Sequence, residues 1–142
     1  MSARFWMRAA AVITLLLAIG HSLGSPWTPA GSPQARALVT AMSTYRFDVM
    51  GLERSYHDFY VGFGWTLSVY VIGHAVLYWL IAGLATEFPG KARAIVAVFC
   101  LEALCVTLLS WAFLFWIPVA LNGLVTVCLG LAFFNLLPRP TH

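Results

Sequence analysis

The sequence predicts an all-α fold, a four-helix transmembrane bundle with an amphipathic helix in an extracytoplasmic loop. Composition is the first reason, because 61% of the 142 residues are hydrophobic, 9% are charged and the mean hydropathy is +0.86. Such a chain has too few polar residues to cover the surface of a soluble monomer. The second reason is the apolar stretches at residues 5–24, 59–86, 92–115 and 118–137, each of which reaches the roughly 20 residues of a helical span. Together they predict a single integral membrane domain over residues 1–142.

The positive charges predict the orientation of these spans. One side of the membrane would carry Arg4, Arg8, Lys91, Arg93 and Arg139, and the other side Arg36, Arg46 and Arg54. Because positively charged residues are enriched on the cytoplasmic side, this bias favours cytoplasmic positions for both termini of a multi-pass protein in the inner (plasma) membrane. The net charge of +3 comes from scattered residues with no basic run, so we expect no nucleic-acid partner.

Residues 1–24 also have the pattern of a signal peptide. Arg4 and Arg8 would form its positively charged region, residues 9–19 its apolar region and residues 22–24 a tolerable cleavage site. We expect the segment to be retained as the first membrane helix, with cleavage as the alternative.

The segment between the first two apolar stretches is too long to be a simple connector. Ser32 precedes Pro33, which combines a preferred N-cap residue with proline in the first helical turn, so a short helix should begin there. Apolar residues recur at helical spacing at Ala35, Leu38, Val39 and Met42. This pattern predicts an amphipathic helix that lies at the membrane surface or covers the bundle as a lid.

The second span begins in a segment that contains several charged residues. Arg54 and Asp58 are four residues apart, so in a helix at the membrane interface they would lie on one side and form an ion pair. This pair either fixes the start of the helix or, together with His57, lines the mouth of a pocket beneath the loop. Both interpretations stay open, and Arg54 and Asp58 are candidate substrate contacts.

Three ionisable residues, His21, His74 and Glu102, lie inside the apolar stretches. Ionisable groups are unfavourable in a bilayer, which makes such residues candidates for function. No Lys or Arg lies near Glu102 on its own helix, so its carboxyl is either paired with another helix or protonated and hydrogen-bonded to a backbone carbonyl or a Tyr. Counting about 1.5 Å per residue places His74 and Glu102 within roughly 5 Å of the same depth. We expect them to lie on facing sides of one intramembrane cavity.

Aromatic residues are expected to line this cavity. The candidates that share a helical face with His74 are Tyr60, Phe63, Tyr70 and Tyr78, and Trp116 is expected on the face of Glu102. Tyrosines four residues before and after His74 would surround its imidazole with rings and hydroxyl groups.

The last span contributes one polar candidate. Asn122 either hydrogen-bonds between helices or orients a ligand. Cys100, Cys105 and Cys128 are odd in number and include no Cys-x-x-Cys pair, so they are expected to be small apolar core residues and not a redox pair.

Two runs of residues carry a resemblance to known proteins. They are the Gly-His-Ser-Leu-Gly run at residues 20–24 and the run at residues 50–64, which begins Met-Gly-Leu-Glu-Arg-Ser-Tyr. In them the chain resembles uncharacterised small four-helix bacterial integral membrane proteins over its first half, a resemblance that implies no function. A looser chemical analogy, without a shared motif, links the intramembrane His and Glu to the emopamil-binding sterol isomerases.

Two functions of different classes fit these residues. The first is a membrane enzyme that performs acid/base chemistry (isomerisation, cyclisation or epoxide opening) on a lipophilic small molecule, with Glu102 as the acid and His74 as its partner or base. The second is a non-enzymatic module that binds a lipid, quinone or haem, or an accessory subunit of a membrane complex. We expect no metal or haem, because His21 and His74 differ in depth by roughly 7 to 8 Å. His21 is then counted with the substrate contacts, and the oligomeric state, a homo-oligomer included, stays open.

Overall fold

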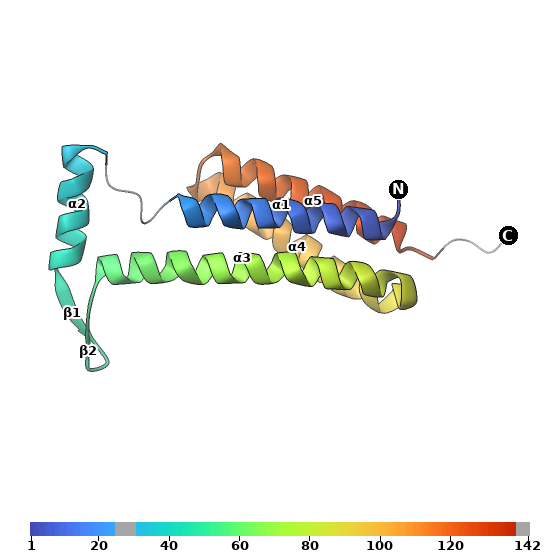
Figure 1. Cartoon of the computed structure of the whole chain (residues 1–142), viewed down its shortest axis with the longest axis horizontal. Helices are drawn as coiled ribbons and strands as arrows, with labels where there is room; N and C mark the ends of the chain where they lie inside the picture. Colours follow the sequence, from blue (N-terminus) through green and yellow to red (C-terminus); the bar gives the residue numbers. More distant parts are fainter. Residues whose placement is uncertain (25–30, 139–142) are drawn as a thin grey trace. The chain divides into compact units, whose positions relative to one another are not determined.

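The computed structural model describes residues 1–24 and 31–138, and Figure 1 labels its elements. These are α1 (Ala3–Leu23), α2 (Pro33–Thr44), β1 (Arg46–Val49), β2 (Leu52–Ser55), α3 (Tyr56–Glu87), α4 (Pro89–Phe113) and α5 (Trp116–Asn135). The described chain is therefore helical apart from one short hairpin. Arg139, one of the charges that predict orientation, lies outside the described residues. By its internal contacts the chain divides into two units, unit 1 (Met1–Ala18 with Val71–His142) and unit 2 (Ile19–Tyr70).

Four of the helices are long and apolar enough to cross a membrane. They are α1, α3, α4 and α5, with mean hydropathies between 1.5 and 2.2 over their most apolar windows. Each coincides with a predicted span to within three residues at either end. Length and hydropathy alone therefore located these helices correctly, because both are properties of a contiguous stretch of sequence.

Small residues dominate the core of unit 1. Met7 of α1, Ala82 of α3, Val96 of α4 and Ala132 of α5 are fully buried in one cluster. Alanine at such positions lets helix backbones approach closely, as in membrane bundles. Large apolar side chains lie mostly outside instead; Leu101, for example, is 62% exposed. An apolar outer surface of this extent suits a lipid environment.

Helices α4 and α5 form the most extensive helix pair. Thr107 of α4 and Thr126 of α5 share a hydrogen bond of 3.2 Å between their hydroxyl oxygens. One turn away, Asn122 Nδ2 donates to Ser110 Oγ at 3.4 Å. Polar contacts between helices are favourable where the alternative is an unsatisfied group in an apolar surrounding.

The break between α4 and α5 follows from Pro118. If α4 continued, the proline ring would clash with the carbonyl of Leu114, four residues earlier. Leu114 and Phe115 are instead extended, with φ/ψ of −117°/−158° and −113°/173°, and α5 starts at Trp116 with the proline in its first turn. The expectation that Trp116 shares a face of α4 with Glu102 was therefore wrong, because Trp116 belongs to the next helix.

In unit 2, α2 begins where the sequence predicts. The Ser32 hydroxyl accepts a hydrogen bond from the backbone N–H of Ala35 at 3.1 Å, and Pro33 occupies the first turn. The burial expected of a lid is absent, however, because α2 has no buried residue and Leu38 is 62% exposed. Met42 is half-buried. The apolar stripe is therefore left largely uncovered by the described chain.

The hairpin of β1 and β2 was not predicted. Its strands are antiparallel, with Val49 opposite Leu52, so only Met50 and Gly51 form the turn. Both have positive φ, 55° and 86°, which is the conformation of a two-residue type I′ turn. Gly51 at the second turn position was the signal for this turn in the sequence. It was overlooked because Arg54 and Asp58 were interpreted as neighbours on one face of a helix.

Candidate functional site

The structure brings His74 and Glu102 into contact. Nε2 of His74 on α3 lies 3.0 Å from Oε1 of Glu102 on α4. The two helices are joined through Phe88, with His74 fourteen residues before it and Glu102 fourteen residues after it. Because both helices rise by about 1.5 Å per residue, an antiparallel turn at Phe88 brings the two side chains to the same level. The partner of Glu102 is therefore an imidazole on another helix.

Aromatic rings pack around the imidazole of His74. The ring of Phe99 meets it edge to face, with 5.6 Å between centroids and an interplanar angle of 82°. The ring of Tyr78 also packs against both rings, with its centroid 6.0 Å from that of His74 and 5.1 Å from that of Phe99. Tyr78 is only 4% exposed, so this part of the site is fixed by packing. Tyr78 was predicted as a lining residue; Phe99 was missed, although it lies one turn before Glu102.

The pair is open on one side. The side chain of His74 is 26% exposed and that of Glu102 is 45% exposed. Neighbouring apolar side chains on α4, Val98 and Leu101, are more than half exposed. The carboxyl thus lies in an apolar outer face, accessible from outside the chain, where an enclosed cavity had been expected.

The contact can hold one proton in two ways. Either the carboxyl of Glu102 donates to Nε2 of a neutral His74, or the Nε2–H of a protonated His74 donates to the carboxylate. Both states have no net charge, so the proton can move between the residues without placing a net charge in an apolar surrounding. An arrangement of this kind can give a proton to a bound molecule and take one back.

Asn122 makes a contact between helices. Its hydrogen bond to Ser110 joins α5 to α4, which agrees with the interhelical interpretation. Trp116 is 76% exposed at the start of α5. The cysteines form no disulfide, and they differ in burial: Cys128 is buried, as expected of a core residue, whereas Cys105 is exposed.

His21 takes part in a hydrogen-bonded contact in unit 2. Nε2 of His21 donates to the backbone carbonyl of Gly64 at 3.1 Å. Ser22 Oγ donates to Ser68 Oγ at 3.0 Å, and Ser68 Oγ in turn donates to the carbonyl of Gly64 at 3.3 Å. These bonds fix the end of α1 against the first half of α3.

Three of the predicted aromatic lining residues also belong to unit 2. Tyr60, Phe63 and Tyr70 are 46%, 69% and 64% exposed, respectively. Phe63 contacts Phe59 with 6.1 Å between ring centroids. Their role as lining residues stays a prediction.

The expected ion pair between Arg54 and Asp58 is replaced by a helix cap. Arg54 is in β2, opposite Phe47, so it does not share a helical face with Asp58. Asp58 Oδ2 accepts from the backbone N–H of Ser55 at 2.8 Å, and the backbone N–H of Asp58 donates to Ser55 Oγ at 3.2 Å. This reciprocal Ser-x-x-Asp cap ends the strand and starts α3 at Tyr56.

Comparison with protein-family models, with curated proteins and with solved structures finds no match to this chain. Among residues 1–24 and 31–138, no group of three His, Cys, Asp or Glu side chains is placed to bind a metal ion.

Proposed function

We propose that this chain is an integral membrane enzyme, with both termini in the cytoplasm, that performs acid/base chemistry on a lipophilic small molecule at His74 and Glu102. The observation that carries the proposal is the 3.0 Å contact between these residues on two candidate membrane spans, open on one side. The apolar outer surface of unit 1 supports the membrane setting. A substrate that dissolves in the bilayer could reach the carboxyl directly from the lipid.

The chemistry that the pair supports best is isomerisation. Glu102 gives its proton to a double bond or basic atom of the substrate, and the carboxylate that remains accepts a hydrogen bond from neutral His74 in the tautomer that carries its hydrogen on Nε2. The substrate then returns a proton from a neighbouring carbon to the pair, which restores the starting state. No oxidant, reductant or co-reactant is consumed. The rings of Phe99 and Tyr78 can stabilise positive charge that develops beside them.

A second function rests on the exposure of Glu102. A carboxyl that is 45% exposed in an apolar face can also hydrogen-bond to a helix of another membrane protein. In that case the chain is an accessory subunit, and His74 keeps the carboxyl neutralised until the partner binds.

Deuterium incorporation distinguishes the two functions even when the substrate is unidentified. The protein is purified, incubated in deuterated water with a lipid extract of the host membrane, and the lipophilic molecules are analysed by mass spectrometry. Acid/base chemistry at carbon should add deuterium to a particular molecule in the presence of the wild-type protein and not of Glu102→Gln. Glu87→Gln, which removes a carboxyl at the end of α3, is the matched control and should behave as wild type. Equal incorporation with wild type and Glu102→Gln would reject the enzyme.

A further inference from the structure

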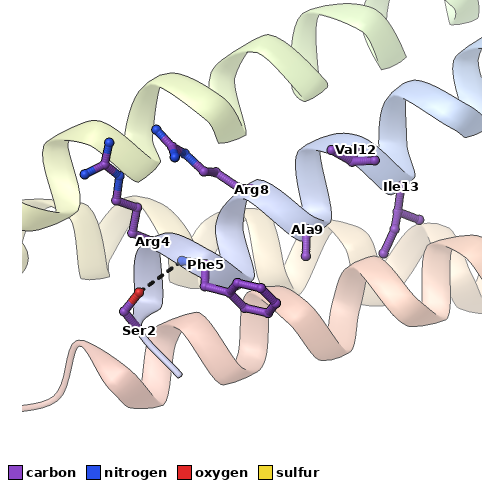
Figure 2. Close-up of a pocket in the computed structure, with 7 residues that line it drawn as sticks. All are labelled: Ser2, Arg4, Phe5, Arg8, Ala9, Val12 and Ile13. Atoms are coloured by element: carbon purple, nitrogen blue, oxygen red, sulfur yellow. Dashed lines mark hydrogen bonds between the residues drawn. The ribbon is translucent and has the colours of Figure 1, made fainter.

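Two open pockets lie side by side at the end of unit 1 that holds the start of α1. The first has a volume of about 670 Å³ and follows the first turns of α1, with Arg4 and Arg8 among its lining residues (Figure 2). The second has a volume of about 760 Å³ and is lined by the start of α1, the α3–α4 junction and the end of α5. Arg93, in the first turns of α4, is among its lining residues. Both pockets include Ser2 and Arg4, so Arg4 lies where they meet.

The lining of these pockets is positively charged. Of the described residues that line them, three are arginines and none is Asp or Glu. Figure 2 shows the side chains of Arg4 and Arg8 extending from the same side of α1, one turn apart. The described part of the chain contains ion pairs for other residues but none for Arg4, Arg8 or Arg93. These three arginines therefore have no ion-pair partner among the described residues.

Arg8 provides an independent observation. Its guanidinium carbon lies 4.7 Å from the ring centroid of Trp79 on α3, a cation–π contact that fixes the side chain in place. Its Nε is buried and has no hydrogen-bond partner in the described chain, so an anion from outside would meet the other atoms of the side chain, which line the first pocket. Arg8 is also five residues inside α1, where apolar residues follow it. A partly desolvated cation held in a fixed position favours an anion that comes from outside the protein.

The first pocket continues from the arginines onto apolar surface. Beyond Arg8 it is lined by Ala9, Val12 and Ile13, and Val12 is 49% exposed. A free phosphate ion would leave this apolar part unused. A phospholipid would use both parts, because its phosphate meets the arginines while an acyl chain lies along the helix.

We propose that Arg4, Arg8 and Arg93 bind the phosphate of an anionic phospholipid, with one of its acyl chains along the apolar part of the first pocket. This proposal rests on the membrane setting of the proposed function but not on the acid/base chemistry. The site lies at the helix ends, whereas neither pocket includes His74 or Glu102.

Native mass spectrometry of the full chain in detergent tests this proposal, because detergent solution removes any effect of orientation in a membrane. The protein is titrated with phosphatidylglycerol, with phosphatidylcholine of the same acyl chains, and with inorganic phosphate. We expect phosphatidylglycerol to bind at least several-fold more tightly than phosphatidylcholine. Equal binding of the two lipids would overturn the proposal, and inorganic phosphate that displaces phosphatidylglycerol at equal concentration would overturn the acyl-chain part of it, because the site would then bind phosphate alone.

Variants locate the site. The combined Arg4→Gln and Arg8→Gln changes should weaken phosphatidylglycerol binding by about thirtyfold, since each arginine near a lipid surface contributes about 1 kcal/mol. Arg36→Gln removes the same charge from α2 and should bind as wild type. Arg93→Gln, a single change at the surface of α4, should weaken binding several-fold and keeps the test valid if the combined variant does not fold. Unchanged binding in the arginine variants, or an equal loss in Arg36→Gln, contradicts the site. Lipid binding is read as added mass and catalysis as deuterium incorporation, so failure of one proposal is distinguishable from failure of the other.

Discussion

The carboxyl of Glu102 on α4 meets the imidazole of His74 on α3, with 3.0 Å between Oε1 and Nε2. Each residue is a hydrogen-bond partner of the other in a face that is otherwise apolar. Removal of one partner therefore has a different consequence from removal of both, which makes the pair accessible to experiment.

The first prediction concerns stability. His74→Phe should lower the free energy of unfolding by about 1 kcal/mol or more, because it leaves the carboxyl of Glu102 without its partner. The double variant His74→Phe with Glu102→Leu should recover most of this loss, since no polar group then remains unpaired. Thermal unfolding in detergent measures both. If the separate losses of His74→Phe and of Glu102→Leu simply add in the double variant, the residues do not interact.

The second prediction concerns catalysis. Glu102→Gln keeps the shape of the side chain and can still hydrogen-bond to His74, but it cannot transfer a proton. We expect it to remain folded and to lose turnover by about 10² or more, the usual scale for a positioned acid or base. The rate of deuterium incorporation into the substrate gives the measurement. Full activity in Glu102→Gln would end the catalytic assignment.

The third prediction concerns orientation. In a background without the native cysteines, Ser2→Cys should react with a membrane-impermeant maleimide only after the cells are permeabilised. Met50→Cys, at the fully exposed hairpin turn, should react from outside intact cells. Labelling of Ser2→Cys from outside would reverse the proposed orientation.

The fourth prediction concerns the start of α3. Asp58→Ala removes the acceptor for the backbone N–H of Ser55 and should lower stability by about 1 kcal/mol. Glu53→Ala is the control, because its ion pair with Arg46 is exposed and should contribute little. Circular dichroism during thermal unfolding compares the variants. An equal effect of the two changes would mean that the cap is not the source of the stability.

Local sequence rules were sufficient for much of the fold. Length and hydropathy predict the spans, and Ser32 with Pro33 predicts the start of α2. The number of residues between each of His74 and Glu102 and the α3–α4 junction predicts that the two side chains lie at a similar depth. Each of these depends on residues within one or two neighbouring elements.

The remaining features depended on competition between local structures. A helical register for Arg54 and Asp58 was plausible, but the turn at Met50 and Gly51 and the Ser55 cap place Arg54 in a strand instead. The position of Trp116 likewise depended on where Pro118 interrupts the helix. The contact of Arg8 with Trp79 joins residues far apart in the sequence, so no local pattern predicts it.

The hairpin turn also offers a practical site for insertion. Met50 is 99% exposed and adopts a positive φ that residues other than glycine disfavour, so opening the chain between Met50 and Gly51 relieves strain and removes no buried contact of Met50. A protein of 15.6 kDa is small for single-particle imaging. A rigid domain fused at this turn would leave the strands paired beneath it and provide the additional mass that particle alignment requires.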